Sequence, residues 1–463
     1  MLIDAFDCVS PLDFRYYAND PRLVELLGPY VSERGRLRAE LAVEAAVVRV
    51  LARHGLCSQA VADEVTAAIE RVEPEAVAQE DARIHHSTRA LVNCLRAEVS
   101  DAAKPFIHFL LTSFDVKDTA TAWRFRQASE RAIVPTLLQL EETLISLALR
   151  EKDTLQMGRT HGQHAEPITF GFAIASFVSR LGGRIEAVRA AAGGLRGKIS
   201  GAVGAHNAQS LFIDDPLVFE RDVLAESGLE PSISSTQITE AEPMADFIHA
   251  LVSTLGVLAN LADDMRHLQR TEISEVAEEF AAEQVGSSTM PHKRNPWNFE
   301  NIKSMWKAMA PRMVTVYMDQ ITEHQRDLSN SASARWLPEI IVVLVSTARR
   351  ATRLMGRIVT DREAMARNFA MTHGLCAAEP AYVLLAACGH PDAHEAVRKL
   401  TLEAQATGRE FPDVFFGAAE VQPYVAQFSE RQVDLLRNVA HYTGIASQKT
   451  ERICAVWRER LGL

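Results

Sequence analysis

The chain has 463 residues and a formal net charge of −11, from 60 acidic and 49 basic residues. An apolar share of 47% with 24% charged residues is typical of a soluble globular protein, and this length predicts two or three domains. The acidic balance argues against nucleic acid or an anionic membrane as partner. Six cysteines without metal-site spacing indicate reduced thiols in a cytoplasmic protein, and residues 1–7 lack the apolar core of a signal peptide.

Helical periodicity begins after a short N-terminal segment. Residues 10–17 precede it and predict an extended segment or turn, in which Arg15 and Tyr16 suit either a packed arm or an anion clamp. Residues 21–54 and 60–71 then follow helical patterns without strand alternation.

Two adjacent histidines, His85 and His86, come before an apolar helical segment over residues 91–99. Neighbouring side chains on a helix point about 100° apart. At most one of the two histidines can therefore face any given site.

Hydroxyl and carboxylate groups precede the next helix, which is predicted to start near Asp118. Thr112, Ser113 and Asp115 suit the role of capping residues at such a start. His108 lies in an apolar run and is predicted to be packed rather than catalytic.

A polar, glycine-punctuated stretch over residues 157–167 separates two long helices. The second helix is predicted to open near Pro167 and to end at Gly193–Gly194 rather than Gly182–Gly183. Lys198, in the glycine-spaced loop that follows, is predicted to be a solvated cation.

Two long helices follow a regular apolar rhythm. Thr239 and Glu242 predict the capped start of a helix that runs to about Ala282. Spacings of three and four recur at Ile248, Leu251, Leu255, Leu258, Ala262 and Met265, and again at Ile341, Leu344, Ala348, Ala351, Met355 and Ile358. We expect these stripes to build a bundle shared between subunits.

Shorter helices are predicted after residue 360, at 362–371, 379–387 and 394–406, with a last one from Gln448. The fold class is therefore all-α. The expected domains are an N-terminal helical domain (1–111), a central long-helix bundle (112–359) and a small C-terminal helical domain (360–463).

The most informative stretch runs from Gly286 to Pro296, with the sequence GSSTMPHKRNP. Two prolines exclude ordinary mid-helix structure, so the stretch is predicted to be a loop. Hydroxyls, Lys293 and Asn295 together match what binding of a carboxylate requires.

Familiar cofactor and nucleophile motifs are missing from the sequence. His161 and His164 lack a third ligand in a matching context, which disfavours a zinc site. Acid–base chemistry on an anionic substrate, without cofactor or metal, fits the polar breaks better.

These motifs carry a resemblance. The loop 286–296 is similar to the signature of the fumarase/aspartase superfamily, homotetrameric lyases that eliminate fumarate from succinyl compounds. Four further segments resemble the adenylosuccinate lyase branch of this superfamily. They are 10–16 (SPLDFRY), 112–115 (TSFD), 158–167 (GRTHGQHAEP) and 325–328 (QRDL). The resemblance spans nearly the whole chain.

The resemblance implies catalytic roles. Ser287 would be the base, in a closed site that favours its alkoxide, with Ser288 as an alternative. Lys293 and Asn295 would stabilise the carboxylate whose negative charge grows. His161 would give a proton to the leaving nitrogen.

It also implies a set of binding residues. The substrate-positioning residues would be His86, Thr112, Ser113, Thr160, Gln237 and Met290. The nucleotide phosphate would be held by Arg15, Tyr16, Arg326, Ser331 and Arg335.

Two departures concern the part of the substrate beyond fumarate. Ser87 stands where the family usually has Asp, and Ala241–Glu242 replace a basic residue followed by Asp. The expected reaction is elimination of fumarate from adenylosuccinate and from the succinyl-carboxamide ribotide of purine biosynthesis (SAICAR, giving AICAR). The alternatives are the same chemistry on a different succinyl-amine, or a non-catalytic structural tetramer.

Overall fold

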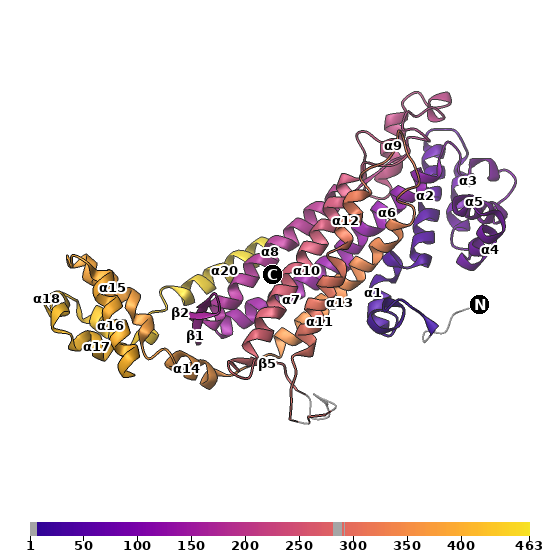
Figure 1. Cartoon of the computed structure of the whole chain (residues 1–463). Coiled ribbons are helices and arrows are strands. Elements are labelled where there is room, and N and C mark those ends of the chain that lie inside the picture. The colour runs from indigo at the N-terminus through magenta and orange to yellow at the C-terminus, as the bar shows by residue number, and fades with distance from the viewer. Residues whose placement is uncertain (1–6, 281–288, 291) are drawn as a thin grey trace. The chain divides into compact units, whose positions relative to one another are not determined.

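The computed structural model describes residues 7–280, 289–290 and 292–463. These residues form helices joined by short segments, together with three small two-stranded sheets (Figure 1). The predicted all-α class is confirmed.

The chain divides into two compact units. The first unit comprises Met1–Leu138, Gly183–Leu258 and Ser304–Arg349, and the second comprises Gln139–Gly182, Ala259–Lys303 and Arg350–Leu463. Each unit therefore gathers segments that are far apart in sequence. The division at residues 111 and 359 stays a prediction.

Helices supply the framework of the first unit. Those lying wholly within it are α1 (Pro21–Val31), α2 (Glu33–Arg53), α3 (Gln59–Ala68), α4 (Pro74–Ile84), α5 (Ser87–Ala97), α6 (Ser113–Ala128), α9 (Pro216–Ala225) and α12 (Arg312–Met318). A parallel pair joins β3 (Arg196–Gly197) and β4 (Glu230–Pro231). Five long helices each contribute residues to both units. They are α7 (Val134–Arg150), α8 (Phe170–Gly194), α10 (Glu242–Leu268), α11 (Trp297–Met309) and α13 (Leu337–Gly356).

The predicted helical stretch 21–54 is two helices, α1 and α2. Asp20 accepts a hydrogen bond from the Leu23 amide (3.1 Å) at the start of α1, and Ser32 accepts one from the Gly35 amide (3.0 Å) at the start of α2. Such caps satisfy amides that have no partner inside a helix. The break lies at Ser32, between two helices that both bury apolar side chains.

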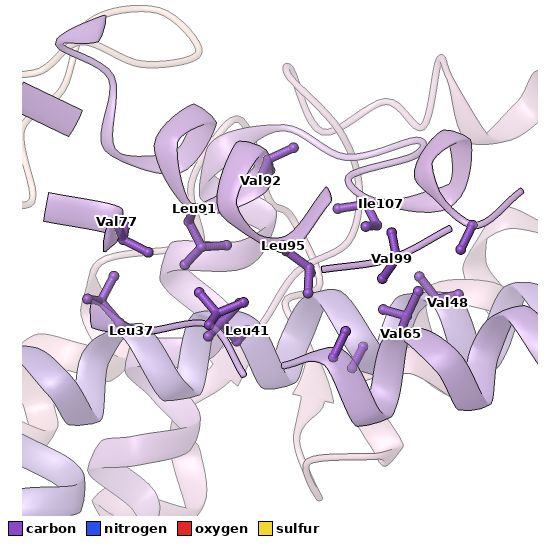
Figure 2. Close-up of a cluster of buried hydrophobic side chains, with 14 of the residues drawn as sticks. Leu37, Leu41, Val48, Val65, Val77, Leu91, Val92, Leu95, Val99 and Ile107 are labelled. Atoms are coloured by element: carbon purple, nitrogen blue, oxygen red, sulfur yellow. The ribbon is translucent and has the colours of Figure 1, made fainter. Parts of the chain in front are cut away.

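One apolar core of the first unit lies where α2 meets the helices before residue 100. Leu37 and Leu41 of α2 face Leu91 and Leu95 of α5 (Figure 2), and all four are at most 5% exposed. The same cluster contains Val48, Val65, Val77, Val92, Val99 and Ile107. Removing these side chains from water stabilises the unit that carries the cavity described below.

The two predicted apolar stripes, over residues 248–265 and 341–358, are buried within the single chain. None of their twelve members exceeds 6% exposure. The stripes are therefore not available for an interface between subunits, and that reason for expecting an oligomer was wrong. The first of the two helices, α10, also ends at Leu268 rather than near Ala282.

Two helical stretches among the described residues, Ser113–Arg150 and Glu242–Leu268, are long and apolar enough to cross a membrane by length and composition. In each, 61% of the most apolar window is buried inside the protein. Core helices of globular proteins show the same combination, so these stretches belong to the packed interior.

The polar stretch before α8 forms a β-hairpin, which the sequence did not predict. Strand β1 (Leu155–Thr160) pairs antiparallel with β2 (Gln163–Thr169), and α8 begins at Phe170 rather than near Pro167. His161 and Gly162 form the two-residue turn, with φ of 55° and 75°. Positive φ at both central positions matches the right-handed twist of hairpin strands.

The second unit ends in short helices, three of them close to their predicted bounds. They are α14 (Arg362–Ala370), α15 (Ala378–Ala387), α16 (Ala393–Thr407), α17 (Phe411–Gly417), α18 (Gln422–Val425), α19 (Glu430–Arg437) and α20 (Ala446–Leu461). Helices α15, α16 and α17 share one apolar cluster. A short antiparallel pair joins β5 (Val276–Ala277) and β6 (Val359–Thr360).

Candidate functional site: a cationic cavity and two catalytic segments

A cavity of about 520 Å³ opens within the first unit. Its walls come from the start of α2, from one face of α6, from residues 238–245 and from residues 316–338. Three residues of the predicted phosphate clamp line it, namely Arg326, Ser331 and Arg335. The structure thus brings this part of the predicted site together.

Arg326 is held in the cavity wall by two contacts. Its guanidinium lies 4.0 Å from the centre of the Phe114 ring, and its Nη2 donates to Asn330 Oδ1 at 2.6 Å. Burial lowers the pKa of Arg326, yet an arginine stays charged at neutral pH. Its buried Nε has no hydrogen-bond acceptor among the described residues. A charged donor without an acceptor is suited to binding an anion.

Arg124 of α6 is a second cation in the cavity wall, and sequence analysis missed it. Its Nη1 donates to the Tyr30 carbonyl at 2.9 Å, while its buried Nε lacks an acceptor in the described part of the chain. Burial, with a smaller effect of Arg36, lowers the pKa of Arg124 to about 10. The helical pattern around it gave no signal, because one arginine among polar helix residues is usually solvated.

Acidic groups in the cavity wall are largely engaged. Arg36 donates to Glu33 (2.9 Å) and is ion-paired with Glu40. Asp118 accepts the Thr239 amide at 3.0 Å, and burial raises the pKa of Asp118 to about 6. The arginines of the cavity are therefore not all neutralised by these carboxylates.

Four other predicted binding residues are neighbours of lining residues rather than lining residues themselves. His86, Ser113 and Gln237 stand next in sequence to members of the cavity wall, and Thr112 stands two positions before one. These members are Ser87, Phe114 and Ile238.

Two of the four cap helices. His86 Nδ1 accepts the Arg89 amide (3.1 Å) at the start of α5. Thr112 forms a capping box with Asp115, which accepts the Thr112 amide at 2.8 Å. The capping prediction is confirmed, although α6 begins at Ser113 and not near Asp118.

The prediction that Lys198 is a solvated cation was wrong. It is fully buried and ion-paired with Asp115, which also accepts the Ser200 (3.1 Å) and Gly201 (3.2 Å) amides. A buried ammonium needs such a partner, so Lys198 ties the 197–201 loop to the start of α6.

His108 is packed, as predicted. Its Nδ1 lies 2.7 Å from Glu44 Oε1, and Glu44 is fully buried. Burial lowers the pKa of His108, but the contact with Glu44 outweighs it and raises the pKa overall.

The N-terminal pair Arg15 and Tyr16 lies outside the cavity lining. Both belong to a single helical turn, Leu12–Tyr16, on which Arg15 is exposed. Their predicted part in a phosphate clamp stays a prediction.

In the second unit, the hairpin presents His161 at its exposed tip, next to Thr160. Arg159, two residues before the tip, is ion-paired with the fully buried Glu275 at 2.6 Å. Glu275 also accepts from Gln156 Nε2 at 2.8 Å, so both residues of β1 are held by one carboxylate. Strand β1 is thereby held in place along its length while His161 remains exposed at the tip.

The described part of the signature loop leads into α11. Lys293 is exposed, and its amide donates to the Met290 carbonyl at 3.0 Å; Asn295 is half-buried. Glu278 caps α11 by accepting the amides of Asn298 and Phe299, each at 3.0 Å. Ser287 and Ser288 lie outside the described residues.

Comparisons with known proteins identify the family of this chain. A lyase family pattern matches residues 15–309. Adenylosuccinate lyase of Pyrococcus abyssi is 33% identical over 425 residues, covering 90% of this chain and 92% of the relative. That of Pyrococcus horikoshii is 32% identical over 451 residues, covering 96% and 97%.

Solved structures share the fold. The 3-carboxy-cis,cis-muconate lactonizing enzyme from Pseudomonas putida superposes with a TM-score of 0.81 at 27% identity, over 96% of this chain and 98% of its own. A fumarate lyase from Mesorhizobium sp. BNC1 gives a TM-score of 0.80 at 23% identity, over 93% and 97%. The chain therefore belongs to the lyase family of the fumarase/aspartase superfamily, in which it is similar to the adenylosuccinate lyases over nearly its whole length.

Proposed function

We propose that this enzyme eliminates fumarate from N-succinyl nucleotides, converting adenylosuccinate to AMP and SAICAR to AICAR in purine biosynthesis. The observation that carries the proposal is the cavity of the first unit, in which Arg326 and Arg335 accompany Ser331. These groups suit a phosphate, because guanidinium groups and a hydroxyl donate in the geometry that phosphate oxygens accept. The similarity to curated adenylosuccinate lyases supports the same substrate.

The proposed reaction is a cofactor-free β-elimination. Ser287 takes a proton from the carbon beside a succinyl carboxylate, and the electrons move toward that carboxylate. Lys293 and Asn295 stabilise the negative charge that grows there. The C–N bond then breaks, and His161 gives a proton to the leaving nitrogen. The exposed position of His161 at a fixed hairpin supports this role.

The enzyme is proposed to act in the cytoplasm as a homotetramer whose subunits share active sites. The candidate phosphate-binding residues belong to the first unit and the candidate proton-transfer residues to the second. Exposed apolar side chains between residues 314 and 336 support subunit contacts. They are Val314, Tyr317, Met318, Ile321, Leu328 and Trp336.

The test is fumarate release from adenylosuccinate, followed for the wild type and for Ser287→Ala. We expect turnover in the wild type and a loss of at least about a thousandfold in kcat for the variant, because the step that removes the proton is lost. The oligomer and substrate affinity should be retained, as measured by sedimentation and by binding of AMP.

Ser288→Ala is the matched control, and it separates the two adjacent hydroxyls. Release only from another succinyl-amine would favour the same chemistry on a different leaving group. Release from no succinyl compound would leave a structural tetramer, and dissociation of Ser287→Ala would mean that the loop is structural.

A further inference from the structure

Lys117 is a cation of the cavity wall that the proposed reaction does not use. It lies on the same face of α6 as Phe114, with its ammonium 5.7 Å from the centre of that ring. Its Nζ donates to Ser87 Oγ at 2.9 Å. Within the described part of the chain, no other acceptor bonds to it and no carboxylate forms an ion pair with it.

The nearest acidic groups leave the charge of Lys117 unmatched at contact distance. Glu40 acts on it electrostatically, but the ion pair of Glu40 is with Arg36. Asp81 also contributes only an electrostatic interaction. A half-buried ammonium with one neutral acceptor retains two N–H donors for a ligand.

Burial lowers the pKa of Lys117, which shows that holding this cation in the wall has a cost. The hydroxyl of Ser87 orients the ammonium without cancelling its charge. An aspartate at position 87 would neutralise it. The pair Ser87 and Lys117 therefore presents a positively charged donor in the cavity wall.

We propose that Lys117, oriented by Ser87, forms a second anion-binding subsite, which receives an acidic group of the leaving amine in addition to its phosphate. This inference rests on the proposed elimination of fumarate, and it names a leaving amine that differs from AMP and AICAR, since neither carries a carboxylate beside its phosphate. Arg326 contacts the same Phe114 ring from 4.0 Å, so the cavity offers two cationic positions around one aromatic side chain. The preferred substrate class is a succinylated amine that carries both a phosphate and a carboxylate.

The experiment uses two product-like ribotides that differ in one group. Both keep the amine and the 5′-phosphate of AMP; one carries a carboxylate at C2 of the purine, and the other carries the matching carboxamide there. Calorimetry on the full-length enzyme should show the carboxylate binding at least about tenfold more tightly, since a charge-assisted hydrogen bond replaces a neutral one. In Lys117→Met the two compounds should bind about equally.

Ser87→Asp is the second variant, and it leaves the lysine in place. The new carboxylate would pair with the Lys117 ammonium, so the preference should disappear although the cavity keeps its shape. Lys399→Met, at an exposed position of α16, is the matched control and should bind like the wild type.

Equal weakening of both ribotides in Lys117→Met would mean that the lysine reads the phosphate, and it would overturn the second subsite. An unchanged preference in both variants would overturn it too. Fumarate release is measured in parallel. A carboxylate preference without fumarate release would support the subsite and contradict the proposed function. Fumarate release without the preference would support the proposed function and contradict the subsite.

Discussion

The buried charged side chains of this protein fall into two kinds, those paired within the fold and those with an unsatisfied donor. Asp115 and Lys198 are both fully buried and pair across 83 positions of sequence. Asp115 also accepts three backbone amides, so its charge is compensated from several sides. Arg124 and Arg326 instead keep a buried Nε without an acceptor among the described residues. The first pair stabilises the fold, and the second pair suits a ligand.

Glu141 of α7 is a buried acid of a different kind. It is fully buried, and neither carboxylate oxygen has a hydrogen-bond partner in the described part of the chain. Burial, with a smaller effect of Glu142, raises the pKa of Glu141 from 4.5 to about 9. The folded protein therefore holds this group protonated at neutral pH.

Because the folded pKa is the higher one, the contribution of Glu141 to stability is full below its unfolded pKa of 4.5. It declines as pH rises and is lost as pH passes about 9. The free energy of unfolding of Glu141→Gln should therefore rise relative to that of the wild type as pH increases, by about 3 kcal/mol between pH 4.5 and pH 7. Denaturant unfolding across this range measures the gap. Glu142→Gln, beside it, is the control, and a gap independent of pH would contradict the buried, protonated state.

At the scale of elements, one short segment fixes both catalytic candidates of the second unit. Glu275 holds strand β1 of the hairpin through Gln156 and Arg159, and Glu278 caps α11 after the signature loop. The two carboxylates are only three residues apart. The proposed proton donor and the described end of the signature loop are thus both anchored to residues 275–278.

Glu275→Ala should destabilise the protein by about 3 to 5 kcal/mol, because Arg159 would be left as an uncompensated, largely buried charge. It should also lower kcat at least about tenfold with little change in KM, since a displaced hairpin misplaces His161. Unfolding and steady-state kinetics measure the two effects. Glu272→Ala, at an exposed neighbouring position, serves as the control. An unchanged kcat in a destabilised Glu275→Ala would limit Glu275 to a structural role.

At the scale of the whole molecule, the two units carry different parts of the proposed chemistry. The cavity cations belong to the first unit, while His161 and Lys293 belong to the second. In the proposed tetramer, these sets meet through neighbouring subunits. If active sites are shared between subunits, two inactive variants can restore activity when they assemble into mixed tetramers.

Arg326→Ala and His161→Ala should each be nearly inactive at low substrate concentration. Coexpressed as mixed tetramers, they should recover about a quarter of the wild-type activity, because random assembly gives one site in four an intact contribution from both chains. Fumarate release from the purified mixture measures the recovery. Coexpression of His161→Ala with His161→Asn is the control and should recover nothing. No recovery in the first mixture would mean that each site is built by one chain.

Much of the fold could be predicted from sequence because helix burial follows a local pattern. The stripes of α10 and α13 and the bounds of α14, α15 and α16 agree with the structure. The hairpin around His161 was missed, because its polar residues follow no strand alternation and it is held by a distant carboxylate, Glu275.

The sequence alone determined the all-α class, since helix burial follows a local pattern, and its motifs carried the resemblance to the lyase family. That resemblance is also the source of the predicted phosphate clamp of Arg326, Ser331 and Arg335. Only the tertiary structure decided that the long apolar stripes are satisfied within one chain. It also decided that Lys198 is a buried partner of Asp115 and that Lys117 faces the cavity. The physical reason is the same in each case. Whether a charge is solvated, paired or open to a ligand depends on residues brought near it by folding, and their distance in sequence leaves no local pattern.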